Sequence, residues 1–259
     1  FSALLTKVGI YALVRVFSLI FIHQLEITHQ LLGWLSALTM VLGMIGVIAY
    51  RDVQKVLVYN IIVAAGFVVF GLAVFSQTAF EGIVYYLVHD MIAKALLFLA
   101  GGLIIMLAGT AKLKQMGGLM KTYPGLGWIF LITAFSIAGI PPLSGFIGKL
   151  LIVQGGLSSG QTAHYWFAGI GLLSSLLLLY SLVRLFMDAF WKLPPEEEGA
   201  AEVPQVSRRQ YRFLLVPCAV LLAISIVVGL CAEWIYPYVQ QAAETLADPS
   251  IYIQAVLKE

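Results

Sequence analysis

The sequence predicts an all-α polytopic membrane protein with about seven transmembrane helices, one of them discontinuous. Of its 259 residues, 61% are apolar and 11% are charged, whereas about a quarter of the residues in a soluble domain are charged. The mean hydropathy is +0.96. Apolar runs of about 20 residues, the length at which a helix crosses a bilayer, recur along the chain. One of these runs contains the adjacent prolines Pro141 and Pro142, which interrupt it.

The predicted spans lie, in order, at about 2–22, 31–49, 56–75, 82–107, 126–154, 165–187 and 211–235. The stretch 192–210 combines prolines, a glutamate run and basic residues, so it is predicted to be a cytoplasmic loop, either a solvated connector or a contact for a partner subunit. The tail 236–259 is expected to lie on the membrane surface or on a neighbouring chain. Because the sequence opens at Phe1 with a span already under way, we expect the numbering to begin inside a longer protein.

The positions of Lys and Arg predict the orientation of the chain. If every span crosses once, the loops 23–30, 76–81 and 155–164 share one side and contain neither Lys nor Arg. The basic loop residues then share the opposite side: Arg51, Lys55, Lys112, Lys114, Lys121, Lys192, Arg208, Arg209 and Arg212. The positive-inside rule makes this side cytoplasmic and places the C-terminus outside. The net charge of +2 therefore reports topology and gives no reason to expect nucleic acid.

The first span carries two basic residues, Lys7 and Arg15. A charge at the centre of a lone membrane helix costs about 2.5–3.5 kcal/mol, so such residues normally face a protein interior or a water-filled path. The two side chains are about 80° apart around a helix and need not share a face. Lys7 is interpreted as a path residue, with snorkelling to the membrane surface as the alternative. Arg15 is interpreted as structural.

The fourth span carries three titratable groups in "YYLVHDMIAKALLFLAGG". Asp90 and Lys94 have i, i+4 spacing with the acid first, which is the favourable order for a helical ion pair. His89 lies about 100° away on the same turn. Asp90 is the only acid deep within a predicted span. Together these groups could pass a proton through water; the alternative is a structural ion pair with His89 as a hydrogen-bonding neighbour.

The fifth span contains "AGIPPLSGFIGKLLI". Pro141 and Pro142 remove two backbone donors, so the span cannot be one regular helix. Broken helices exist at membrane depth only where protein or water satisfies the freed backbone groups. Lys149 follows the break by about two turns, and a charge beside a discontinuous helix is a recurring transporter device. The alternative is a kink that shapes packing, with Lys149 snorkelling outward.

The two cysteines, Cys218 and Cys231, both lie in the last predicted span. They are expected to pack as small apolar side chains and to form neither a disulfide framework nor a metal site. The sequence contains no cysteine cluster, no glycine-rich dinucleotide loop and no paired haem histidines. We therefore expect no cofactor and no metal.

Five motifs in this order resemble one known family: "LLTKVGIYALVRVF", "RDVQKVLVYNIIVAAGF", "LVHDMIAKALLFLAGG", "MGGLMKTYPGLGW" and "AGIPPLSGFIGKLLI". They resemble the proton-conducting antiporter-like family, which includes the large subunits of Mrp (multiple resistance and pH) sodium/proton antiporters and the antiporter-like subunits of respiratory complex I. The likeness is strongest to the Mrp group, through "HDMIAKALLFL", "IPPLSGFIGKLLI" and "DPSIYIQAVLKE". The resemblance implies a fold of about fourteen spans with two inverted units that each contain a broken helix, of which this chain resembles the second half.

The resemblance also implies roles for individual residues. Lys7 matches the bridging lysine of the family's eighth span, His89 and Lys94 match the polar groups of its eleventh, and Lys149 matches the lysine beside the break in its twelfth. The family's paired acid and lysine are expected upstream of Phe1.

The sequence departs from the family pattern in one span. The stretch "NIIVAAGF" has alanines where relatives often carry a histidine before the glycine, and Gln54 replaces a basic residue. We therefore expect Tyr59, Asn60 and water to serve the middle of the path.

The sequence thus predicts a proton-translocating subunit of a multisubunit Na⁺/H⁺ antiporter in the bacterial plasma membrane, a secondary transporter and not an enzyme. Protons would pass from Lys7 to His89 and Lys94 and then to Lys149, with Asp90 biasing the proton occupancy of Lys94. The resemblance implies other antiporter subunits as partners. Two alternatives stay open: a proton-pumping subunit of complex I or a membrane-bound hydrogenase, with electron transfer elsewhere, and a purely structural bundle.

Overall fold

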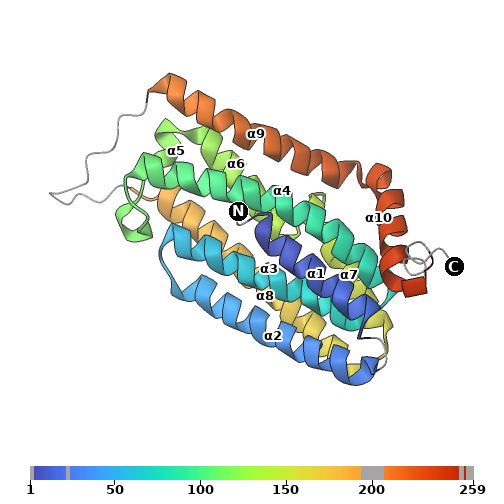
Figure 1. Ribbon diagram of the computed structural model, residues 1–259. Helices are drawn as coiled ribbons and strands as arrows, with labels where there is room; N and C mark the ends of the chain where they lie inside the picture. Colours follow the sequence, from blue (N-terminus) through green and yellow to red (C-terminus); the bar gives the residue numbers. More distant parts are fainter. Residues whose placement is uncertain (1–2, 22–23, 194–206, 251–253, 255–259) are drawn as a thin grey trace.

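The computed structural model is a bundle of helices (Figure 1) and describes residues 3–21, 24–193, 207–250 and 254. Its α-helices are α1 (Leu5–Leu19), α2 (Leu25–Ala49), α3 (Val53–Val74), α4 (Gln77–Ala108), α5 (Leu119–Thr122), α6 (Pro124–Ala138), α7 (Ser144–Ser158), α8 (Thr162–Phe186), α9 (Arg208–Leu230) and α10 (Ala232–Ala247). A 3₁₀ turn η1 (Leu113–Gln115) and a π-helical turn η2 (Met187–Trp191) complete the described elements. The all-α prediction is confirmed.

Within the described residues, five helices are long and apolar enough to cross a membrane: α2, α3, α4, α8 with its extension through η2, and α9. The other two predicted spans consist of shorter helices. The first is α1, with 15 residues, and the fifth is divided between α6 and α7, with 15 residues each. The count of seven is therefore approximate, and the discontinuity of the fifth span is confirmed.

The helices extend beyond their apolar cores. α2 begins at Leu25 and α4 at Gln77, so most of the predicted loops 23–30 and 76–81 is helical. Ser76 caps α4 by accepting a hydrogen bond from the backbone of Ala79 at 3.3 Å. Hydropathy detects the part of a helix that faces hydrocarbon, whereas hydrogen bonding and caps determine where the helix starts.

The break in the fifth span begins at Gly139. This residue ends α6 in the left-handed region, with φ +88°, which favours glycine. Its N–H donates to the carbonyls of Phe135 and Ser136, both at 3.1 Å. Pro141 and Pro142 follow, and α7 starts at Ser144. The carbonyl groups at the end of α6 therefore have no helical continuation that would donate to them.

The last predicted span, 211–235, is wrong at its C-terminal end. α9 stops at Leu230, and α10 starts at Ala232 after a corner at Cys231. Figure 1 shows α10 turned across the end of the bundle, and it packs against α4 and α1. The first half of the predicted tail, through Ala247, is thus helical and contacts this chain itself, whereas residues 251–253 and 255–259 lie outside the described part. Cys218 is buried as expected, but Cys231 is partly exposed at the corner.

The loops fall at two ends of the bundle. The α2–α3 turn, the segment from α4 to α6 and the end of η2 share one end, and the α1–α2, α3–α4, α7–α8 and α9–α10 connections share the other (Figure 1). The basic loop residues therefore gather at one end, here called the basic end. Of the predicted loop 192–210, residues 194–206 lie outside the described part; after them, Ser207 and Gln210 form a capping box at the start of α9.

α4 is the central element of the bundle, because it packs against α3, α6, α7, α9 and α10. Glycines allow the close approach of α7. A Cβ on Gly148 would lie 2.8 Å from Cα and Cβ of Tyr86, so only a residue without a side chain fits there. This contact brings the break between α6 and α7 against the middle of α4, where the titratable side chains lie.

Candidate functional site

Asp90 lies between two lysines. Its Oδ2 forms an ion pair with the ammonium of Lys7 on α1 and a second one with the ammonium of Lys94, 3.2 Å away on its own helix. All three side chains are buried, with at most 3% of the side-chain surface exposed. The predicted i, i+4 pair is confirmed. Burial of Lys7 excludes the alternative in which it snorkels to the surface.

Lys149 folds back toward the helix break. Its Nζ donates to the backbone carbonyls of Ile137 at 2.8 Å and Ala138 at 3.0 Å, and to Oγ of Ser175 on α8 at 2.9 Å. The side chain is 7% exposed, so the snorkelling alternative is wrong here as well. A cation at this place satisfies the free carbonyls at the end of α6 and complements the negative end of that helix.

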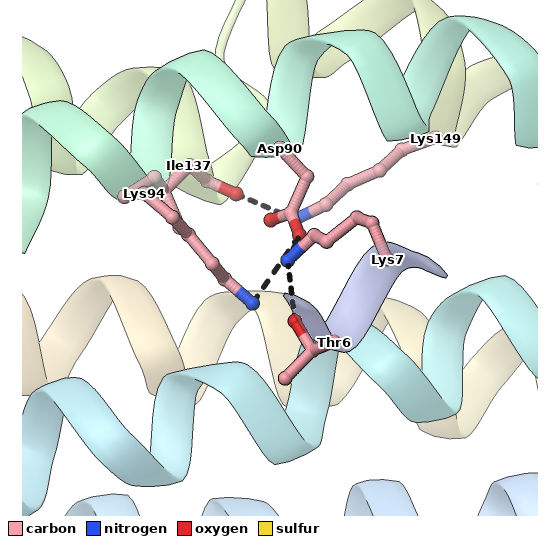
Figure 2. Close-up of polar contacts among 6 residues, drawn as sticks. All are labelled: Thr6, Lys7, Asp90, Lys94, Ile137 and Lys149. Carbon is pink, nitrogen blue, oxygen red and sulfur yellow. Dashed lines mark hydrogen bonds and ion pairs between the residues drawn. The ribbon is translucent and has the colours of Figure 1, made fainter. Parts of the chain in front are cut away.

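The lysines and Asp90 occupy one region. Figure 2 shows Lys7, Lys94 and Lys149 extending from α1, α4 and α7 toward the space around the Asp90 carboxylate. Within the described residues the ion pairs of this region involve one carboxylate, that of Asp90. Apart from its ion pair, the Lys94 ammonium has no hydrogen-bond acceptor among these residues. Because an ammonium carries three donors, Lys94 retains capacity for a further partner.

His89 connects the lysine region to a cluster of serine hydroxyls. Its Nδ1 lies 2.7 Å from Oγ of Ser144, the first residue of α7. Ser144 in turn lies 3.1 Å from Oγ of Ser225 on α9, and Ser136 on α6 lies 3.3 Å from Ser225. The three serines are almost completely buried. Hydroxyl groups both donate and accept, so this cluster joins both sides of the helix break to His89 and α9.

Tyr59 and Asn60 do not join these groups by a described contact. Tyr59 stacks on Tyr50, with ring centroids 5.3 Å apart, next to the α2–α3 turn at the basic end. Asn60 is fully buried, and neither its amide oxygen nor its amide nitrogen has a hydrogen-bond partner among the described residues. Asn60 is thus a buried polar group on α3, whereas Tyr59 lies at the margin of the bundle.

Sequence reasoning missed several polar residues that the fold brings to this region or to its end. They include the three serines of the cluster and Ser175, which accepts a hydrogen bond from Lys149. They also include Glu81, which lay just outside the predicted span 82–107 but belongs to α4 and is 8% exposed. Single serines in apolar helices give no distinctive signal, because many bond to the carbonyl of their own helix. Glu81 could have been found from the sequence, since an acidic residue directly beside a membrane-length apolar run is unusual.

The described residues contain no group of three or more His, Cys, Asp and Glu side chains placed to hold a metal ion. The chemistry that the residues offer is proton exchange between amines, imidazole, carboxylate and hydroxyls.

Comparison with known proteins agrees with the motifs. Residues 1–178 match the family described as NADH:quinone oxidoreductase/Mrp antiporter, TM. The chain is 52% identical to the D subunit of the Na(+)/H(+) antiporter of Bacillus subtilis (strain 168) over 259 residues, which is 100% of this chain and 51% of that protein. The chain spans about half the length of the curated relatives it matches.

Solved structures share the fold. A chain of the Mrp complex from Dietzia sp. DQ12-45-1b matches with a TM-score of 0.88 and 29% identity, covering 99% of this chain and 54% of that one. A chain of respiratory complex I from Thermus thermophilus matches with a TM-score of 0.73 and 24% identity, covering 93% and 50%, and shows likeness of fold alone. The resemblance deduced from the motifs is thereby confirmed, and the chain belongs to the NADH:quinone oxidoreductase/Mrp antiporter transmembrane family.

Proposed function

We propose that this chain is a proton-translocating part of a multisubunit Na⁺/H⁺ antiporter and acts as a secondary transporter, not as an enzyme. The observation that carries the proposal is the ion-pair arrangement in which Asp90 is shared by Lys7 and Lys94. The names of the relatives support it: the D subunit of a Na(+)/H(+) antiporter and a chain of an Mrp complex. Other subunits of such a complex are the proposed partners.

The shared carboxylate gives the two lysines a means of coupling. One negative charge balances one ammonium, so a proton that arrives at Lys7 changes the electrostatic energy of a proton on Lys94. Asp90 can pair more closely with either lysine at little geometric cost, because both contacts use the same oxygen, Oδ2. Proton movement along the cluster then needs only small displacements of side chains.

Lys149 is the proposed next site. Its ammonium is held by two carbonyls and a hydroxyl at the helix break, all of which are acceptors for a charged lysine. A neutral amine donates more weakly to such acceptors, so loss of the proton frees the side chain to move. His89 precedes Asp90 on α4 and contacts α7, the helix that carries Lys149, through Ser144. The proposed path therefore runs from Lys7 and Lys94 past His89 to Lys149.

The orientation is part of the proposal. The basic end of the bundle is placed in the cytoplasm by the positive-inside rule, and the end that carries α10 faces outward. The proposed membrane is the bacterial plasma membrane.

A Lys94→Ala substitution in the complete antiporter complex tests the proposal. We expect Na⁺-dependent proton exchange in membrane vesicles to fall at least about tenfold, because the proton site on α4 is lost while the buried space becomes apolar. Lys114→Ala, which removes an exposed lysine at the basic end, is the matched control and should leave exchange unchanged. Full exchange by a correctly assembled Lys94→Ala complex at every pH would leave the structural bundle as the better account. Co-purification of flavin or iron–sulfur subunits with the complex would instead favour a redox-driven pump.

A further inference from the structure

A second buried carboxylate lies near the end of the bundle that carries α10. Glu81 is in the second turn of α4 and is 8% exposed. Its Oε2 accepts a hydrogen bond of 2.6 Å from the hydroxyl of Tyr236 on α10, and its Oε1 accepts one of 3.5 Å from the side-chain amide of Gln77. Both partners are neutral, and within the described residues Glu81 has no ion pair.

No basic side chain in the described parts of α7, α9 and α10 forms an ion pair with Glu81. α7 approaches this turn closely through Ile152, which a Cβ on Gly82 would contact at 2.7 Å, and through Gly155, whose Cβ would lie 2.8 Å from Oγ of Ser76. Burying a carboxylate without a cation is costly, and two neutral hydrogen bonds offset only part of that cost. A residue whose role was only to link α10 to α4 by a hydrogen bond would not need to carry a charge.

Polar groups occur at each turn of α4 between Glu81 and His89. Glu81, Tyr85 and His89 follow one another at intervals of four residues, so they lie along one side of the helix. The buried Tyr85 hydroxyl donates to the carbonyl of Val228 on α9 at 2.6 Å. One turn earlier on α9, Ser225 contacts the Ser144 hydroxyl that bonds to His89. The interface of α4 with α9 and α10 thus carries polar groups from the serine cluster to the end of the bundle.

We propose that Glu81 is the proton-exchange site at the end of the path opposite the basic loops, and that Tyr236 is its positioning residue; this rests on the proposed function. The Glu81 carboxylate takes up one proton from a hydronium ion on the His89 side: one O–H bond of the hydronium breaks and leaves water, and one O–H bond forms on the carboxyl group. At the outer end the carboxyl O–H bond breaks and the proton passes to a water molecule, which becomes hydronium and restores the carboxylate. The Tyr236 hydroxyl fixes the carboxylate and holds α10 across this end of α4, where Figure 1 shows it.

Variants of the complete antiporter complex in membrane vesicles test the site. We expect Glu81→Gln to reduce Na⁺-dependent proton exchange at least about tenfold, whereas Glu81→Asp, which keeps an exchangeable proton, retains part of it. Glu233→Gln removes an exposed acid of α10, at the same end of the bundle, and should leave exchange unchanged. Wild-type exchange by an assembled Glu81→Gln complex, together with loss of exchange in Lys94→Ala, overturns the role of Glu81 alone. Wild-type exchange in both variants overturns the proposed function itself.

Two further readouts keep the inference testable if Glu81→Gln fails to assemble. Infrared difference spectra of the wild-type complex between high and low pH should contain a carboxylic C=O band that Glu81→Asp shifts, and a band that does not shift contradicts proton uptake at this residue. Tyr236→Phe keeps the ring but removes the hydroxyl, and it should displace the pH profile of exchange. Tyr238→Phe, at a tyrosine that is 75% exposed on α10, should not displace it; identical profiles for both tyrosine variants and the wild type overturn the positioning role.

Discussion

Replacing Asp90 by Asn tests whether one carboxylate balances two lysines. Asn keeps the shape of the side chain but removes the charge that contacts Lys7 and Lys94. The attraction across the 3.2 Å contact to Lys94 is roughly 5 kcal/mol at an effective dielectric constant of about 20. Desolvation offsets much of this attraction in the intact pair, but removing one partner of a buried ion pair costs about 3–5 kcal/mol because the remaining charge is uncompensated. We expect Asp90→Asn to destabilise the assembled complex by about that amount.

A double variant provides an independent check of the same shared counter-charge. Asp90→Asn/Lys94→Met removes one of the two uncompensated ammonium groups, so it should be less destabilised than the sum of the single variants, by about 1–3 kcal/mol. The measurement is denaturant unfolding of the purified complex in detergent, compared for the wild type, both single variants and the double variant. Equal stability of Asp90→Asn and the wild type, or simple additivity in the double variant, would refute the idea of a shared counter-charge.

Two further predictions concern α7. Lys149→Arg should keep the hydrogen bonds to Ile137 and Ala138 and permit assembly. It should abolish exchange, because a guanidinium does not release its proton. Normal exchange in vesicles would exclude Lys149 as a proton site. Gly148→Ala should destabilise the complex by about 1–3 kcal/mol, since its Cβ would lie 2.8 Å from Tyr86. Gly102→Ala, where nothing lies within 4 Å, is the control and should be neutral or stabilising; a loss of thermal stability common to both glycine variants would contradict the packing argument.

The features that the sequence predicted correctly are local ones. The Asp90–Lys94 pair follows from i, i+4 spacing alone, and the break in the fifth span follows from the missing donors of two prolines. The direction of the Lys149 side chain follows less directly. A lysine two turns beyond a break reaches either the surface or the break, and the free carbonyls of Ile137 and Ala138 select the break.

The features that the sequence could not predict depend on contacts between distant segments. The pairing of Lys7 with Asp90 joins α1 to α4, and the serine cluster joins α6, α7 and α9. The corner at Cys231 was missed because the apolar run continues past it, from α9 into the packed face of α10. Asn60 and Tyr59 were chosen from a departure in sequence from the family, and such a departure does not say where a side chain lies.

The distribution of charge supports the proposed transport path over a structural core. A structural ion pair is most stable when each charge has its own partner and every donor is satisfied. Here two lysines share one carboxylate oxygen, and the Lys94 ammonium has no hydrogen-bond acceptor among the described residues. Such a cluster is less suited to stabilising the fold than to the proposed proton exchange, because its protonation states differ little in geometry and strongly in mutual electrostatic energy. The same argument applies to Lys149 at the helix break. Carbonyls that accept no hydrogen bond within a helix bind a charged lysine more strongly than a neutral one, so the contact weakens when the proton leaves.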